Sequence, residues 1–210
     1  MPHHPNTSRR SGETTTNSHN ITAETDRPSP FIVGIAGGTA SGKSTISLKI
    51  EEALADRTVL LMHMDAYFLS KRPRMLAPIT GQDYEDHNHP DSFDLKKLVE
   101  DLDAHRQERA AQVIIVEGLM TLHHRPLRER LDLAIYIDAP SDERIVRRLR
   151  RDMAKGRDYD EIAEFFLDCV RFRHQEFVEP SRWHADIVLN GSYPSERGLA
   201  VVVEWIRQHS

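Results

Sequence analysis

An apolar run that leads into a glycine-rich loop stands near the start of the chain: Phe31-Ile32-Val33-Gly34-Ile35-Ala36-Gly37-Gly38-Thr39-Ala40-Ser41-Gly42-Lys43-Ser44-Thr45. The first six residues are typical of a buried strand, and the amphipathic stretch near 43–55 predicts a helix directly after the loop. The loop matches G-x-x-x-x-G-K-[ST] in the strand–loop–helix context that this pattern requires. Ordinary composition gives the pattern by chance in about one chain in a hundred, so we interpret it as a phosphate-binding loop (P-loop).

The residue types of this loop fit a nucleoside triphosphate, ATP or GTP. Glycines allow positive φ and bring successive amide N–H groups around a phosphate, at the positive end of a helix dipole. We expect Lys43 to reach the β- and γ-phosphates and Ser44 to present its hydroxyl to Mg²⁺. The predicted nucleotide-binding residues are Gly37, Gly38, Thr39, Ala40, Ser41, Gly42, Lys43, Ser44 and Thr45, together with Arg147 from a later cationic segment.

Apolar runs and amphipathic stretches alternate along the rest of the chain. Strands are predicted at 31–36, 59–63, 113–116, 133–137 and 187–189, and helices near 43–55, 94–108, 141–155, 158–177 and 195–208. Continuous apolar runs suit strands that are covered on both faces. Strand–helix alternation therefore predicts an α/β fold with a parallel, doubly wound sheet.

Composition divides the chain near residue 28. Residues 1–28 contain no Phe, Trp, Tyr, Leu or Val, so they cannot bury enough apolar surface to offset the entropy cost of ordering, and we predict a disordered N-terminal tail. Residues 29–210 are predicted to form one domain, in line with the usual domain size.

Charge and cysteine content exclude several classes of protein. The chain has 28 Lys and Arg against 33 Asp and Glu, a net charge of −5, which argues against a general nucleic-acid binder. Cys169 is the only cysteine, so no internal disulfide can form, and a reducing cytoplasm is the expected location. No apolar stretch approaches the ~18–20 residues that span a bilayer, and the first residues do not resemble a signal peptide. A homo-oligomer is compatible with the sequence.

Two further predicted strands end in carboxylates. Asp65 follows the strand at 59–63, and Glu117 follows the strand at 113–116. Because the carboxyl ends of parallel strands meet at the ligand crevice, both acids are expected to face the phosphates. We assign Asp65 as the base that accepts a hydroxyl proton, and Ser44, Asp65 and Glu117 as the Mg²⁺ site. The alternative for each acid alone is a carboxylate that caps a helix.

A strongly cationic segment follows. Residues 141–157 carry seven cations and three acids, and residues 158–168 carry five acids and no cation. A cationic helix, a glycine and a second helix are typical of a mobile lid over a triphosphate, here at about 147–170. Arg148 and Arg151 are predicted to act in catalysis with Lys43 and Asp65. The alternative is a solvated helix face whose arginines pair with the acids that follow.

The ordered set of motifs resembles the uridine (uridine–cytidine) kinases of the uridine kinase/phosphoribulokinase group over about residues 31–190. The motifs that carry the resemblance are the P-loop, Asp65-Ala66-Tyr67-Phe68, His89-Pro90-Asp91-Ser92-Phe93-Asp94, Glu117-Gly118, the segment from Arg147 to Asp158, Phe177-Val178-Glu179-Pro180 and Ala185-Asp186-Ile187-Val188. The resemblance implies a five-stranded P-loop kinase fold and transfer of an ATP or GTP γ-phosphate to a sugar hydroxyl.

The resemblance also implies roles for individual residues. The aspartate that matches Asp65 is the catalytic base in that family, and the residues that match Ser44 and Glu117 serve Mg²⁺. Arginines that match Arg148, Arg151 and Arg157 serve the substrate and the phosphates. The predicted substrate-binding residues are Tyr67, Phe68, Asn88, His89, Arg148 and Arg157. Two roles are open for Tyr67 and Phe68: their rings stack on a ring of the substrate, or they fill the hydrophobic core.

Three positions depart from the family pattern. Asn88 stands where uridine kinases usually have an aspartate that holds ribose hydroxyls, and Phe165 stands where a glutamine touches the nucleoside. The segment 95–116 is almost filled by a predicted helix and strand, which leaves no room for the family's base-reading β-hairpin. The segment 71–91, with Tyr84, His87 and His89, is long for a loop, and loops of this length are often functional.

The sequence therefore predicts Mg²⁺-dependent transfer of an NTP γ-phosphate to a hydroxyl of a small ribose-containing metabolite, pyrimidine ribonucleosides first. Other acceptors that remain open are a nicotinamide-type riboside, a sugar phosphate and a pantothenate-like alcohol. A nucleotide-dependent binding or switch protein is the alternative from another class, because a P-loop by itself does not specify a reaction.

Overall fold

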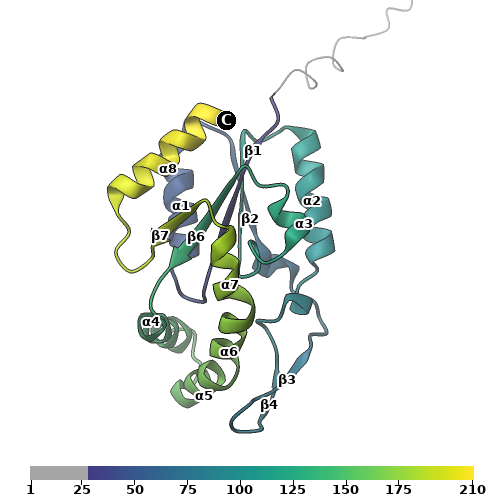
Figure 1. The fold of residues 1–210 in the computed structure, drawn as a ribbon, viewed down its shortest axis with the longest axis vertical. Coiled ribbons are helices and arrows are strands. Elements are labelled where there is room, and N and C mark those ends of the chain that lie inside the picture. Colours follow the sequence, from purple (N-terminus) through teal and green to yellow (C-terminus); the bar gives the residue numbers. More distant parts are fainter. Residues whose placement is uncertain (1–27) are drawn as a thin grey trace, which may run out of the picture.

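The computed structural model describes residues 28–210 (Figure 1). The predicted tail therefore lies, apart from Pro28, outside the described residues. The described chain forms a five-stranded parallel sheet in the order β2-β5-β1-β6-β7, which confirms the predicted fold class. The strands of this sheet are β1 (Phe31–Gly37), β2 (Val59–His63), β5 (Val113–Glu117), β6 (Leu133–Asp138) and β7 (Ile187–Asn190).

Helices cover both faces of this sheet. The face with Ile32 and Ala36 of β1 packs against α2 (Leu95–Glu108), α3 (Arg125–Arg128) and Val178, the residue just before α7 (Glu179–Ser181). The opposite face, with Val33 and Ile35, packs against α1 (Lys43–Ala53) and α8 (Glu196–His209). Every residue of β1 is buried, since successive side chains of a central strand point into one core or the other. This double cover explains why the strands read as continuous apolar runs.

The carboxyl ends of the strands place the predicted functional residues at one edge of the sheet. The P-loop leaves the carboxyl end of β1, which lies between β5 and β6. Asp65 lies in the short helix η1 (Met64–Tyr67) directly after β2, and Glu117 is the last residue of β5. Strand order reverses on either side of β1, so a crevice opens there.

A helical arm crosses the same edge. It begins with α4 (Ser141–Met153), turns at Gly156, whose φ is +84°, and returns as one long helical segment over residues 159–181, which we call the lid helix. The lid helix contains α5 (Tyr159–Phe165), η3 (Phe166–Val170), α6 (Arg171–Arg173), η4 (His174–Val178) and α7. Two parts of it, η3 and η4, are π-helical, and η5 (Arg182–His184) follows it.

The segment between η1 and α2 folds into a hairpin. Strands β3 (Arg74–Leu76) and β4 (Asp83–Glu85) pair antiparallel, and η2 (Pro90–Ser92) leads from there into α2. Residues 95–117 hold only α2, its connection and β5, so no hairpin stands there, as the spacing predicted. From the sequence, residues 71–91 are expected only to form a long loop, because the paired strands of the hairpin are three residues each and too short to give a pattern.

Candidate active site

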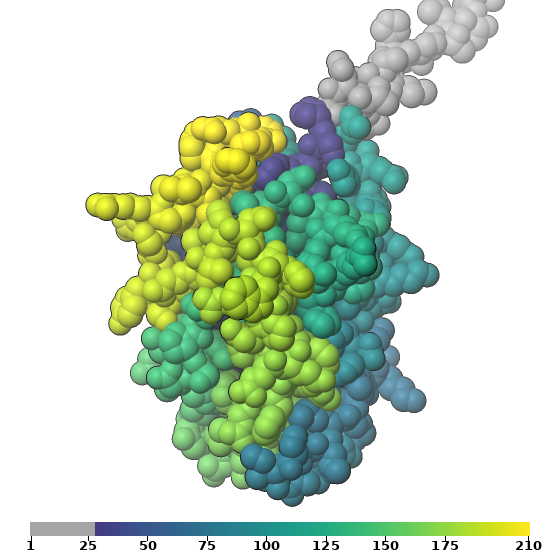
Figure 2. Space-filling model, viewed as in Figure 1, coloured from purple at the N-terminus to yellow at the C-terminus, as the bar shows by residue number. Residues whose placement is uncertain are grey.

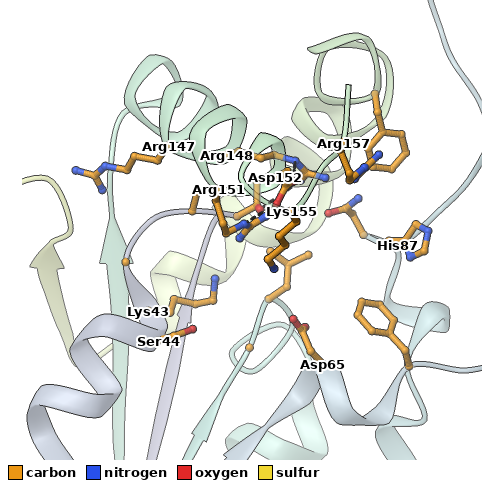
Figure 3. Close-up of a pocket in the computed structure, with 18 of the residues that line it drawn as sticks. Lys43, Ser44, Asp65, His87, Arg147, Arg148, Arg151, Asp152, Lys155 and Arg157 are labelled. Carbon is orange, nitrogen blue, oxygen red and sulfur yellow. Dashed lines mark hydrogen bonds and ion pairs between the residues drawn. The ribbon is translucent and has the colours of Figure 1, made fainter. Parts of the chain in front are cut away.

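A cavity of about 1620 Å³ opens at the carboxyl edge of the sheet. The P-loop forms its floor at one end and the β3–β4 hairpin forms its wall at the other. Lid residues lie above both ends. Figure 3 shows Lys43 and Ser44 on one side, Asp65 across from them, and the lid arginines overhead. The cavity therefore joins a predicted phosphate site to a predicted acceptor site.

The P-loop has the backbone geometry that anion binding needs. Gly42, at φ +102°, is the N-cap of α1, and Gly37 has no room for a side chain, because an added Cβ would lie 2.4 Å from the carbonyl oxygen of Ile137. Residues Thr39, Ala40, Gly42, Lys43, Ser44 and Thr45 line the cavity. Gly37, Gly38 and Ser41 belong to the same turn but do not line the cavity; Ser41 is wholly buried.

Lys43 supplies a positive charge at the phosphate end of the cavity. Its Nζ donates to the carbonyl oxygen of Gly38 at 3.0 Å. Burial lowers the pKa of Lys43, while the charges of Glu117 and Asp65 oppose that shift. A desolvated cation at this point attracts the β- and γ-phosphates more strongly than one in water would.

Glu117 and Ser44 form an oxygen-rich group beside the P-loop. Glu117 Oε1 accepts from Ser44 Oγ at 3.2 Å and lies 2.8 Å from His63 Nδ1. Glu117 Oε2 is buried and finds no hydrogen-bond partner in residues 28–210. Mg²⁺ takes oxygen ligands and is usually held by one or two carboxylates together with phosphates and water. Ser44 and Glu117 therefore fit a Mg²⁺ ion, and the exposed carboxylate of Asp65 lines the same cavity.

The lid arginines are organised by Asp152. Arg151 Nε lies 2.7 Å and Arg148 Nε 3.4 Å from its carboxylate, and Arg148 Nη1 donates to Thr39 Oγ1 of the P-loop at 3.3 Å. Burial lowers the pKa of Arg148 to about 10, so the guanidinium stays charged at neutral pH. Asp152 thus holds two cations over the position where a triphosphate would lie.

The other two predicted lid cations differ from each other. Arg157 lines the cavity. Arg147 also borders it, but Figure 3 shows its side chain pointing away from the other lid arginines. It donates to the carbonyl oxygen of Gly191 at 2.9 Å and to Glu143 at 2.9 Å. These two contacts hold the Arg147 guanidinium against Gly191 and Glu143.

Aromatic side chains surround the acceptor end. His87 packs edge-on against Phe68 and Phe165, with ring centroids 5.8 and 6.3 Å apart, and Tyr84 packs against Phe165 at 5.4 Å. Burial, with help from the charge of Arg72, lowers the pKa of His87, so its imidazole is neutral at pH 7. Phe68, His87, Phe165 and the buried Asn88 all line the cavity. These groups offer flat apolar faces with a few polar atoms.

Tyr67 and His89, both predicted to bind substrate, are not brought to the cavity. Tyr67 packs against the core, its hydroxyl donates to Asp101 at 3.1 Å, and its pKa is raised to about 12 by burial and that carboxylate. His89 Nδ1 accepts the backbone N–H of Asp91 at 3.1 Å and so caps η2. Of the two readings left open for Tyr67, the structure favours filling the core.

Sequence reasoning missed several cavity residues. Asp152 could have been found from its place in the Arg-Arg-Asp run, since an acid among arginines is a natural anchor. Nothing local pointed to Thr80, Gln82 and Glu85 of the hairpin, which reach the cavity only because the hairpin folds back onto the lid helix.

The fold and the cavity together define a P-loop kinase: a parallel sheet, a phosphate loop, strand-end acids and an arginine-bearing lid. A model of the Phosphoribulokinase / Uridine kinase family matches residues 96–194. A uridine kinase from Clostridium botulinum (strain Okra / Type B1) is 36% identical over 183 residues, which cover 76% of this chain and 87% of that protein. A uridine kinase from Clostridium novyi is 31% identical, over 85% of this chain and 96% of that protein.

The chain therefore belongs to the phosphoribulokinase/uridine kinase family, whose members are phosphotransferases that use a nucleoside triphosphate. Among solved structures, that of a possible uridine kinase from Bacillus stearothermophilus shares the fold, with a TM-score of 0.52, 16% identity and coverage of 77% of this chain and 89% of that one. In the described part of the chain, every helix is too short or too polar to cross a bilayer.

Proposed function

We propose that this protein transfers the γ-phosphate of ATP or GTP to a hydroxyl of a pyrimidine ribonucleoside, with Mg²⁺. The observation that carries the proposal is the single cavity that joins the P-loop, Asp65 and the lid arginines to an aromatic acceptor end. The similarity to proteins named uridine kinase supports the choice of acceptor.

Each step of the transfer has a residue suited to it. Asp65 accepts the proton of the attacking hydroxyl. Lys43, Arg148 and Arg151 stabilise the charge that develops on the transferring phosphoryl group. Mg²⁺ held near Ser44 and Glu117, with Asp65 at its shell, would neutralise phosphate charge. Closure of the lid excludes water, which would otherwise compete with the acceptor hydroxyl.

The acceptor residues follow from the cavity. Phe68 and Phe165 offer apolar ring faces, Asn88 and Arg157 offer hydrogen-bond donors, and Arg148 lies between acceptor and phosphates with its guanidinium carbon 5.6 Å from the Phe165 ring. A planar base beside a polyhydroxyl sugar matches such a mixture of stacking and polar groups.

The test is NTP turnover across a panel of acceptors: uridine, cytidine, a nicotinamide-type riboside, a ribose phosphate and pantothenate. We expect uridine or cytidine to give the highest kcat/KM. Asp65→Asn should lower kcat by on the order of 10²-fold or more, because the base is removed while the shape is kept. Wild-type turnover by Asp65→Asn contradicts the assignment of the base.

Two observations favour a second acceptor class in that panel. The described segment between α2 and β5 holds no hairpin, and Asn88 stands where uridine kinases usually have an aspartate. If turnover is highest with a non-pyrimidine acceptor, the chemistry stands and the proposed substrate is wrong. If no acceptor accelerates NTP turnover while nucleotide changes the binding of a partner, a switch protein is the better description. A cytoplasmic location and a homo-oligomer stay predictions.

A further inference from the structure

From Phe165 to Phe177, one face of the lid helix contacts residues 68–94, which we call the hairpin segment. Phe165 packs on Tyr84 and His87, and Asp168 accepts hydrogen bonds from Thr80 Oγ1 at 2.6 Å and Tyr84 Oη at 3.1 Å. Figure 2 shows the hairpin and the lid helix in contact at the same end of the molecule. The contacts continue along the helix at Cys169, Arg173 and Phe177.

The π-helical turns of the lid helix fall within this contact. Asp168 and Cys169 lie in η3, and Phe177 lies in η4, on either side of Arg173 in α6. A π turn inserts an extra residue and shifts the side chains that follow it around the helix, and such turns are frequent at functional sites. The two turns keep these residues facing the hairpin segment over a helix that would otherwise rotate away.

At the centre of the contact lies a buried ion pair that the phosphoryl transfer does not use. Asp86, between β4 and η2, is wholly buried, and its Oδ2 lies 2.6 Å from Nε of Arg173. Its Oδ1 accepts the backbone N–H of Asn88 at 2.8 Å, and its backbone carbonyl accepts from Ser92 Oγ. One carboxylate therefore connects the lid helix to the backbone that carries Asn88.

Asn88 is the residue that this arrangement presents to the cavity. It is 6% exposed, it lines the cavity, and its Nδ2 has no hydrogen-bond partner in the described part of the chain. A buried amide donor without a partner is costly, so a group that accepts its hydrogen bond is expected at that point. No hydrogen bond joins the Asn88 Nδ2 to Asp65 or to the P-loop.

We propose that Asp86 and Arg173 are positioning residues for the acceptor: their ion pair fixes the backbone of Asn88, so that the Asn88 amide donates to an oxygen of the acceptor molecule. The inference rests on the proposed function and deepens it. The oxygen is a hydroxyl or carbonyl oxygen of an acceptor bound in the cavity that Asn88 and Asp65 both line. Discrimination follows, because an acceptor without that oxygen leaves the amide unpaired.

The experiment compares Asp86→Asn, Arg173→Met and Arg173→Lys with the wild type, using the best acceptor of the panel. We expect Asp86→Asn and Arg173→Met to raise the KM of the acceptor about tenfold and to leave the KM of the NTP within twofold. Arg173→Lys keeps the charge and should recover part of the loss. Glu176→Gln is the matched control, because Glu176 is the exposed second partner of Arg173, at 2.5 Å.

Asn88→Ala decides whether the ion pair acts through Asn88. It should raise the acceptor KM by a similar factor, and the double variant Asp86→Asn/Asn88→Ala should raise it no further, since both changes remove one interaction. Additive effects, or KM values for acceptor and NTP that rise together, overturn the inference. Where Asp86→Asn does not fold, Arg173→Lys and its double variant with Asn88→Ala give the same comparison.

Hydrogen exchange separates this inference from the proposed function. In Arg173→Met the backbone amides of residues 86–89, 91 and 92 should exchange faster than in the wild type, while those of the P-loop stay unchanged. Unchanged exchange at 86–92 overturns the positioning role whatever the acceptor is. A wild type that phosphorylates nothing in the panel contradicts the proposed function instead, and leaves the exchange comparison to decide the inference.

Discussion

At the phosphate end of the cavity, one short loop from Thr39 to Thr45 supplies the floor. The acceptor end instead takes Phe68, His87, Asn88 and Phe165 from three separate segments. The first end is built largely from backbone N–H groups and one helix terminus. The second is built from side chains that meet only because the hairpin packs on the lid helix.

We therefore expect the phosphate end to set the rate of phosphoryl transfer and the acceptor end to set which acceptor binds. Backbone groups in a loop bind any triphosphate in the same way, so changes at that end should alter the rate with every acceptor. Side chains from distant segments can change one at a time, so changes at the other end should alter the KM of one acceptor and spare another.

The largest effect is expected at the floor. Lys43→Met should lower kcat by about 10³-fold with every acceptor, because the cation that faces the transferring phosphoryl group is lost. Steady-state kinetics with two acceptors measure it, with Lys96→Met, on an exposed face of α2, as the control. A loss of kcat that differs tenfold between the two acceptors would show that the phosphate end also contributes to acceptor specificity.

Glu117→Gln should come next, with a loss of about 10²-fold at limiting Mg²⁺. The amide keeps the shape but removes the charge beside Ser44, so the metal should bind more weakly. A titration of activity against Mg²⁺ concentration should shift to higher values and recover part of the rate. Glu108→Gln, at the far end of α2, serves as the control. An unshifted titration would show that Glu117 does not serve the metal.

Acid should lower the free energy of unfolding of the protein, because His174 in the lid helix resists protonation in the folded state. Burial, with the charges of Arg144 and Lys43, lowers the pKa of His174 to about 4, although Glu179 lies 3.2 Å from its Nε2. The unfolded chain binds a proton below pH ~6.5 and the folded chain resists it, so stability present above that pH is lost toward pH 4.

The loss that His174 causes should be about 2 kcal/mol in the free energy of unfolding. Urea denaturation at pH 7 and pH 4.5 measures it, and His174→Gln should flatten the dependence. His105→Gln, whose side chain is 40% exposed, provides the comparison. An equal pH dependence in wild type and His174→Gln would show that this histidine does not titrate differently in the two states.

The smallest change in kinetics is expected from a substitution at the aromatic acceptor end of the cavity. Phe165→Ala should raise the KM of a ring-bearing acceptor about fivefold to tenfold, since a stacking face is removed, and should change the KM of pantothenate less. Tyr159→Ala, on the same helix and 52% exposed, is the control. Equal changes for ring-bearing and ringless acceptors would mean that Phe165 shapes the lid and not the acceptor pocket.

Most of the sheet and the phosphate site could be predicted from the sequence. The local sequence of residues 31–45 is enough to predict their structure, because an apolar strand, a glycine turn and the start of a helix follow each other without a gap. The ends of β2 and β5 could likewise be placed, and with them Asp65 and Glu117, since parallel strands must present their carboxyl ends at one edge.

The acceptor end could be predicted only in part. Asn88 and Phe68 followed from their neighbours in sequence, but so did Tyr67 and His89, which the fold turns into the core and onto a helix cap. Residues one or two positions apart in a loop point in different directions, and no periodicity tells which direction is the cavity. The hairpin strands are too short to give a pattern.

By itself the sequence determined that a phosphate loop stands between a buried strand and a helix, and that carboxylates follow two neighbouring strands. Those are local properties, set by glycine conformations, apolar runs and the register of a parallel sheet. Only the tertiary structure decided that Asp86 meets Arg173 and that the same carboxylate binds the backbone of Asn88. The ion pair joins segments 87 residues apart, and its partners are chosen by packing and by the burial of charge, which no stretch of sequence contains alone.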